Sequence, residues 1–253
     1  MLKRSLFAAA LAFAAPASLA AEPADVAAAV AAAGRSAEHR ALDEVRRPVE
    51  VLTWLGLERG DRVLDHFTGT GYYAEIMAGA VGAHGAVFGT NPPHFMGNER
   101  IRAALAGVRG RSANAAFYAM PVASPAFPPD SFDFVMLHLV YHDAYWENEG
   151  FGLPRIDPDV LTRALYAATR PGGIVAVIDH VAAPGRDTRA EVEATHRIDP
   201  AVIRADFERA GFVLDGESDL LRNPDDDRSV NVFDPSIRGR TDRVVYRFRK
   251  PAR

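Results

Sequence analysis

Short apolar strands that alternate with helical segments run through most of this chain. The expected strands are 62–65, 86–89, 115–118, 132–139 and 173–179, and the expected helices between them are 72–81, 98–105 and 158–169. Strands that are apolar at nearly every position are buried on both faces, which is typical of a parallel sheet with helices on both sides. The sequence therefore predicts an α/β fold with a doubly wound, mostly parallel sheet.

The C-terminal part departs from this alternation. We expect a helix over 200–210, which Gly211 ends, and a strand over 212–214. Residues 243–249 alternate apolar and charged side chains, as a half-buried strand does. No helix is expected between these two strands, so they are predicted to be antiparallel neighbours. The intervening segment 222–242 has no periodic pattern, and we expect this long loop to fold over the edge of the sheet as a lid.

The N-terminus has the pattern of a secretory signal. Lys3 and Arg4 precede an apolar run over 6–15, and Pro16 is followed by the small residues that a signal peptidase requires. A run this short does not cross a hydrocarbon core of about 30 Å as a helix. We therefore expect cleavage of residues 1–20, export to the periplasm, and no stable membrane span after cleavage.

Composition narrows the classes of function. Residues 1–20 hold two basic and no acidic side chains, so their removal changes the formal net charge from −4 to −6. No basic run remains, which argues against binding to nucleic acid. The absence of cysteine excludes disulfides, thiolate metal ligands and a cysteine nucleophile. We expect an Ala-rich leader over 21–35 and a single domain over 36–253 that acts on a small molecule.

Three motifs fall at informative places in the predicted sheet. The first is the strand and turn over 63–71, Val-Leu-Asp-His-Phe-Thr-Gly-Thr-Gly, which leads into a helix at Tyr72. Glycines between a first strand and a first helix let a ligand approach the backbone beside a helix N-terminus. The second is Pro-Pro-Asp-Ser-Phe-Asp-Phe-Val over 128–135, and the third runs from Leu165 through Arg-Pro-Gly-Gly to Asp179.

With these motifs in order and at fitting distances, residues 49–179 resemble class I S-adenosylmethionine-dependent methyltransferases. The tail, with Asn223-Pro224 and Phe233-Asp234-Pro235, further resembles an exported bacterial group of predicted methyltransferases. The resemblance implies a Rossmann-like methyltransferase fold with an antiparallel strand near the C-terminus. It also implies S-adenosylmethionine as the cofactor and methyl transfer to an oxygen or nitrogen of a small molecule.

The resemblance also implies the position of the cofactor, at its methionine and sugar end. The residues concerned are Asp65, Phe67, Gly69, Gly71, Tyr72 and Asn91. Phe67 stands where the family usually has its first glycine. Asn91 stands where an Asp or Glu commonly accepts hydrogen bonds from the ribose, and an amide lacks the charge of a carboxylate. Near Met120, no acid stands where the family often has an Asp beside the adenine.

Histidines gather at the predicted carboxyl ends of strands, where open α/β sheets bind ligands. After the fourth strand, His142 lies beside Asp143, and an imidazole with an ordinary pKa near 6.5 is suited to take a proton from an acceptor. Nearby aromatic side chains are suited to form a wall against an apolar or cationic acceptor. The catalytic candidates are Tyr141, His142 and Asp143, and the substrate-binding candidates are His138, Tyr145, Trp146, His180 and Arg197.

Two other functions fit the same residues. One is a non-catalytic periplasmic binding protein that uses the pocket for a different ligand. The other is a metalloenzyme with histidine and carboxylate ligands, for which His138 and His142 share one ion only if their backbone is helical, since on a strand they lie about 13 Å apart. Asp179, His180 and His196 are further possible ligands in that hypothesis.

Overall fold

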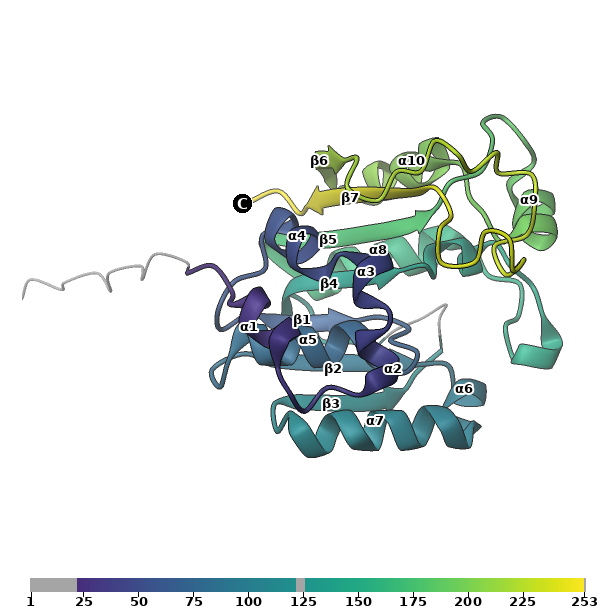
Figure 1. The fold of residues 1–253 in the computed structure, drawn as a ribbon. Coiled ribbons are helices and arrows are strands. Elements are labelled where there is room, and N and C mark those ends of the chain that lie inside the picture. The colour runs from purple at the N-terminus through teal and green to yellow at the C-terminus, as the bar shows by residue number, and fades with distance from the viewer. Residues whose placement is uncertain (1–21, 122–125, 253) are drawn as a thin grey trace, which may run out of the picture.

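The computed structural model describes residues 22–121 and 126–252, and its centre is a seven-stranded sheet (Figure 1). The strands are β1 (Arg62–Asp65), β2 (Ala86–Asn91), β3 (Ala115–Ala119), β4 (Phe132–His138), β5 (Thr169–His180), β6 (Val213–Ser218) and β7 (Arg243–Arg249), in the spatial order β3-β2-β1-β4-β5-β7-β6. The first five strands pair in parallel, and β7 is antiparallel to both β5 and β6. The predicted mostly parallel α/β sheet with an antiparallel C-terminal strand is confirmed.

Helices cover both faces of the sheet. They are α1 (Val26–Ala31), α2 (Ala37–Arg40), α3 (Asp43–Arg46), α4 (Pro48–Leu55), α5 (Tyr72–Val81), α6 (Pro93–Gly97), α7 (Glu99–Arg111), α8 (Pro158–Ala168), α9 (Thr188–Thr195) and α10 (Pro200–Ala210). Alternate residues of β4 enter two separate cores: Phe134 and Met136 pack with α1, α4 and α5, whereas Val135 and Leu137 pack with α8 and α10. Burial on both faces is the reason why β4 is apolar at almost every position.

Residues 37–55 form three short helices, α2 to α4, and the backbone reverses at Arg47 between α3 and α4. This residue has φ 46°, a left-handed conformation that ends α3, and Pro48 then begins α4. Proline suits the first position of a helix because it has no N–H to satisfy there. The break places Arg46, the last residue of α3, near the start of α5, where its guanidinium lies 4.4 Å from the centroid of the Tyr72 ring.

The Ala-rich segment is part of the domain from residue 22 onward. Val26 and Ala29 of α1 are buried in the same core as α4 and α5, and Ala24 donates its N–H to the Leu57 carbonyl. The predicted signal over 1–20 lies outside the described residues, so its cleavage and export stay predictions. Within 22–121 and 126–252, no helix has both the length and the apolar character needed to cross a membrane.

The long segment between β6 and β7 lies, with α9, beyond the carboxyl ends of the parallel strands (Figure 1). We call residues 219–242 the β6–β7 loop. A buried ion pair fixes it, because Arg197 donates to both oxygens of Asp226 at 2.7 and 3.1 Å and neither side chain reaches solvent appreciably. Asp242 then pairs with Arg222 and Arg228. The two pairs of Asp242 lie within the loop, so Asp226 fastens the loop to the domain and Asp242 braces it internally.

We expect Asp226→Ala to lower the free energy of unfolding by about 3–5 kcal/mol, since it leaves the Arg197 guanidinium buried without a carboxylate. The control is Asp225→Ala, which removes an exposed neighbouring carboxylate and should change stability by no more than about 0.5 kcal/mol. Urea denaturation of both variants measures the difference. Equal losses in the two variants would contradict the role given to the buried pair.

Candidate functional site

A cavity of about 710 Å³ lies at the carboxyl ends of β1, β4 and β5. Its walls come from the turn after β1, the start of α5, the segment after β4, the end of α9 and the β6–β7 loop. This is the edge at which doubly wound sheets bind ligands, so the cavity is the candidate site.

The cavity brings together eight of the predicted site residues and leaves out six. Those in its wall are Phe67, Gly69, Tyr72, His138, His142, Asp143, Trp146 and His180. Those outside it are Asp65, Gly71, Asn91, Tyr141, Tyr145 and Arg197. The six outside are all held by other parts of the protein, and each has an identifiable structural role.

In the turn after β1, which we call the glycine turn, one glycine faces free space and the other is in close contact with α7. Gly69 has φ 60°, and a Cβ built there would meet no atom within 4 Å. Gly71 has φ 84°, but a Cβ built there would lie 3.1 Å from a Leu105 methyl. Both need glycine for their left-handed backbone. Only Gly69 presents free space to a ligand, whereas Gly71 allows the close approach of α7.

Asn91 at the end of β2 is engaged with this turn. Its Oδ1 accepts from the Gly69 N–H and its Nδ2 donates to the Gly69 carbonyl, both at 2.9 Å. The side chain is 1% exposed and does not line the cavity. An amide is needed here because it offers one acceptor and one donor. The structure therefore explains why Asn91 stands where the family commonly has an acidic residue: its amide supports the glycine turn.

Asp65 also supports the turn from behind. Its carboxylate accepts from the Thr68 hydroxyl at 2.5 Å and from the backbone N–H of Ala74. Burial raises the pKa of Asp65 to about 6, against the lowering effect of these hydrogen bonds. Asp65 therefore stabilises the first turn of α5 and does not line the cavity.

Phe67 lies in the wall of the cavity and does not fill it. Its φ of 59° is rare for a bulky residue, and its ring packs edge-on against Phe95 with centroids 4.8 Å apart. Phe95 in turn stacks near Phe151, which contacts Trp146. Phe233 joins this row of rings through His196, which contacts Trp146. We define the aromatic wall as Phe67, Phe95, Trp146, Phe151 and Phe233.

His142 lies opposite the glycine turn, in the short 3-10 segment η1 (Tyr141–Ala144). Its Nδ1 is 2.7 Å from Asp179 Oδ1, and its backbone N–H donates to the other Asp179 oxygen at 2.9 Å. Its Nε2 is 3.5 Å from Asp143 Oδ1. Burial lowers the pKa of His142, but the two carboxylates outweigh burial and raise it to about 9. In this environment the imidazole holds its proton at neutral pH.

Three other histidines in the wall are neutral at physiological pH. Burial is the main cause in each: it lowers the pKa of His180 to about 3 and that of His196 to about 4, and the pKa of His138 falls well below its usual value. His180 Nδ1 is 2.7 Å from the Thr241 hydroxyl of the β6–β7 loop. The cavity therefore combines neutral imidazoles with one charged imidazole between carboxylates.

The aromatic pair Tyr141 and Tyr145 turns away from the cavity. Both hydroxyls donate to Asp206 Oδ2 on α10, at 2.7 and 2.5 Å. Tyr141 is fully buried among the side chains of α8 and α10. Arg197 also points away, into the ion pair with Asp226. These three predicted site residues therefore join secondary-structure elements and loops to one another and do not line the cavity.

Arg46 lines the cavity and was missed by sequence reasoning. Its guanidinium stacks on the Tyr72 ring, and among the described residues no carboxylate lies within ion-pair distance of it. Burial lowers its pKa, with Tyr73, Tyr72 and Asp65 opposing that effect. A mostly buried cation usually has a carboxylate or phosphate partner. Arg46 ends a helix far from any predicted strand, so no local pattern identifies it.

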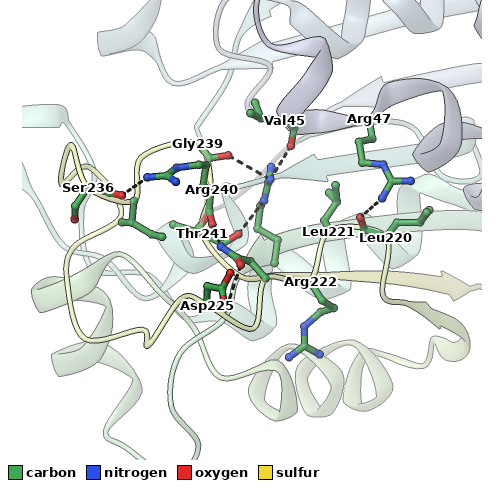
Figure 2. Close-up of a pocket in the computed structure, with 13 residues that line it drawn as sticks. Val45, Arg47, Leu220, Leu221, Arg222, Asp225, Ser236, Gly239, Arg240 and Thr241 are labelled. Atoms are coloured by element: carbon green, nitrogen blue, oxygen red, sulfur yellow. Dashed lines mark hydrogen bonds between the residues drawn. The ribbon is translucent and has the colours of Figure 1, made fainter.

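A second hollow of about 520 Å³ lies between the end of α3, at Val45 and Arg47, and the β6–β7 loop (Figure 2). Figure 2 shows Arg47 directed at the Leu220 carbonyl and Arg240 at Ser236, as their hydrogen bonds of 2.8 and 2.5 Å require. Arg222 is paired with Asp242. The N–H groups of these arginines already donate to other residues of the protein, so the hollow marks the contact between loop and domain. The larger cavity is therefore the candidate site.

Comparisons with known proteins identify the fold. No protein-family model matches the chain. A methyltransferase structure from Aquifex aeolicus, described as S-adenosylmethionine-dependent, superposes with a TM-score of 0.56 and 17% identity over 83% of this chain and 96% of its own. The [4+2]-cyclase SpnF superposes with a TM-score of 0.55 and 21% identity, over 88% of this chain and 86% of its own.

One curated relative is similar in sequence as well. It is a demethylmenaquinone methyltransferase from Geobacillus kaustophilus, 29% identical over 136 residues, which are 51% of this chain. The chain spans about half the length of that relative (50%). The chain therefore has the fold of S-adenosylmethionine-dependent methyltransferases, a fold that also carries a cyclase.

We expect Asn91→Asp to lower the free energy of unfolding at neutral pH by about 1–3 kcal/mol, because a buried carboxylate would face the Gly69 carbonyl without a donor. The new carboxyl would have a folded-state pKa above its unfolded value near 3.9. The loss should therefore vanish below about pH 4 and grow as pH rises through the folded-state pKa.

The matched control is Asn98→Asp. Asn98 caps α7 by accepting from the Ile101 N–H, a role that a carboxylate performs equally well. Thermal unfolding of both variants from pH 4 to pH 8 measures the two effects. A pH-independent change in Asn91→Asp would contradict the reciprocal pairing with Gly69.

Proposed function

We propose that this protein is an S-adenosylmethionine-dependent methyltransferase that acts on a small molecule bound in the 710 Å³ cavity. The observation that carries the proposal is the cation of Arg46, which lines the cavity beside the open glycine turn without a carboxylate partner among the described residues. A ligand that brings its own carboxylate would complete this part of the site.

The residues present fit the methionine end of the cofactor. Gly69 leaves free space where any other residue would place a Cβ, so a ligand chain is able to lie against the backbone of the turn. Arg46 would pair with the carboxylate of the methionine part. The aromatic wall offers ring faces to a sulfonium cation, which is the kind of charge that aromatic rings attract.

The nucleoside end would depend less on charge than the resemblance implies. Asn91 is committed to Gly69, so no carboxylate at the end of β2 is free for the ribose hydroxyls. A smaller apolar hollow of about 220 Å³, lined by Pro92, Pro93 and Pro121, shares Asp143 and Leu153 with the main cavity. Its apolar lining suits an adenine ring, which we place there.

The acceptor would occupy the other end of the cavity, between the aromatic wall and the segment after β4. The cofactor supplies a methyl group bound to a sulfonium sulfur. Trp146 and Phe233 would orient an apolar or aromatic acceptor, with its oxygen or nitrogen toward His142 and Asp143. The Geobacillus relative, whose name specifies demethylmenaquinone, supports an acceptor of aromatic character.

Calorimetric titration of the protein with S-adenosylmethionine and with S-adenosylhomocysteine tests the proposal, and both should bind. We expect Arg46→Gln to weaken both affinities about 10–100-fold, since a hydrogen bond to a charged group contributes about 1.5–3 kcal/mol. The control is Arg163→Gln, whose exposed side chain on α8 pairs with Asp159 away from the cavity and should leave both affinities within about twofold. Absence of heat from the unsubstituted protein at millimolar ligand would refute the proposal.

A second prediction uses two glycines with the same backbone constraint. Gly69 and Gly60 have φ values of 60° and 84°, and neither has an atom within 4 Å of a built Cβ. Alanine at either position should therefore cost a similar amount of stability, about 1–2 kcal/mol. Only Gly69→Ala should lower cofactor affinity, by more than about tenfold, because Gly60 lies before the amino end of β1, away from the cavity. Equal affinities of the two variants would argue against the cofactor at the turn.

A further inference from the structure

Three side chains of the kinds that bind metal ions converge on the cavity wall. His142 and Asp143 come from η1, and His196 comes from the end of α9. One ligand atom from each lies within 4.8 Å of the other two. In tetrahedral zinc sites with nitrogen and oxygen ligands, neighbouring ligand atoms are about 3.3 Å apart. The 3.5 Å between His142 Nε2 and Asp143 Oδ1 is close to that spacing.

His142 is oriented by a carboxylate that is not part of the cluster. Asp179 is fully buried and lies 2.7 Å from His142 Nδ1, so it takes the Nδ1–H as a hydrogen bond and leaves Nε2 as the nitrogen that faces the cavity. A metal ion bound at Nε2 would displace the second proton of the imidazole to solvent. Metal-binding histidines in proteins commonly donate their second N–H to a carboxylate in this manner, and that bond fixes the ring. The Asp179–His142 pair is therefore the support that a metal ligand requires.

His196 provides a second and independent indication. Its ring is 8% exposed, and its Nδ1 is buried with no hydrogen-bond partner among the described residues. Its φ of 56° is a left-handed conformation that histidine seldom adopts. The ring is held edge-on to Trp146, with centroids 4.4 Å apart, and also contacts Phe233. The Val192 backbone favours the protonated imidazole, but it makes no hydrogen bond of ordinary geometry with Nδ1. A buried imidazole that is held so firmly and has a nitrogen without such a bond is a candidate ligand.

We propose that His142 Nε2, the Asp143 carboxylate and one ring nitrogen of His196 bind a divalent transition-metal ion of the zinc type. Two imidazoles and one carboxylate suit zinc, nickel, cobalt and iron better than calcium or magnesium, which prefer oxygen ligands. Three protein ligands leave at least one coordination position, which faces the cavity. Such an open position is characteristic of metal sites that take part in a reaction.

The proposed metal site depends only on His142, Asp143 and His196 and not on the proposed function. Its use in catalysis rests on the proposed function: an acceptor oxygen bound to the open position would lose its proton more readily, because a divalent cation stabilises the anion that remains. The proton would pass to solvent, and the negatively charged oxygen would then receive the methyl group. The oxygen–carbon bond would form as the carbon–sulfur bond of the sulfonium breaks, and S-adenosylhomocysteine would leave as a neutral thioether. No redox step is involved.

The test is direct metal binding by the untagged protein. After treatment with EDTA and removal of the chelator, the protein should bind one Zn²⁺ per chain in competition with a chromophoric chelator, and Co²⁺ should give visible absorption bands. Asp143→Asn and His196→Gln should each weaken Zn²⁺ binding more than about 100-fold. Asp179→Asn should weaken it about 10–100-fold while the stoichiometry stays at one ion, because Asp179 only orients His142.

The control variant is His94→Gln, which removes an exposed histidine of α6 outside the cluster and should leave Zn²⁺ affinity unchanged. Circular dichroism of each variant identifies loss of folding, and if His196→Gln is unfolded, Asp143→Asn alone decides the result. No bound Zn²⁺ and no Co²⁺ bands in the unsubstituted protein, or an equal loss in His94→Gln, would overturn the proposal. Titration with S-adenosylmethionine in EDTA and titration with metal in the absence of cofactor keep this result separate from that of the proposed function.

Discussion

The Asp179 carboxylate at the end of β5 is fully buried, and its two oxygens accept three hydrogen bonds. Two come from the backbone and ring of His142, and the third comes from the backbone N–H of His180. Burial by itself raises the pKa of Asp179, but its contacts with His142 outweigh burial and lower it. A carboxylate in so little solvent requires these donors. It therefore fixes the segment after β4 against the end of β5, and the acceptor side of the cavity takes its shape from this joint.

The fold and the location of the site follow from local patterns in the sequence. Helix 72–81 and strand 243–249 have the predicted bounds. The helix begins after Gly71 and ends before Gly82, and the strand alternates apolar with charged side chains. The edge of the sheet was predicted correctly for a topological reason, since parallel strands bring their carboxyl ends together. Histidines at that edge, such as His138 and His142, therefore do lie in one cavity.

The direction in which a side chain points depends on partners far along the chain, and sequence patterns do not specify them. Tyr141 turns toward Asp206, 65 residues away, and Arg197 turns toward Asp226 on the loop. Arg46 reaches the cavity only because the chain reverses at Arg47 and sets α3 against the start of α5. These three outcomes are decided by packing between elements, which explains why the cavity wall was only partly predicted.

The β6–β7 loop supplies Asn231, Val232 and Phe233 to one end of the cavity, whereas the glycine turn supplies the other end. The loop is fastened to the domain at Asp226 by Arg197, and Asn231 and Val232 also donate to the Ala194 and Thr195 carbonyls of α9. Phe233 is 57% exposed and makes none of these bonds. Descendants of this chain are therefore free to vary position 233 and so change which molecules enter, while the turn after β1 is inherited intact. In evolutionary terms, the two ends of the cavity are separable units of selection.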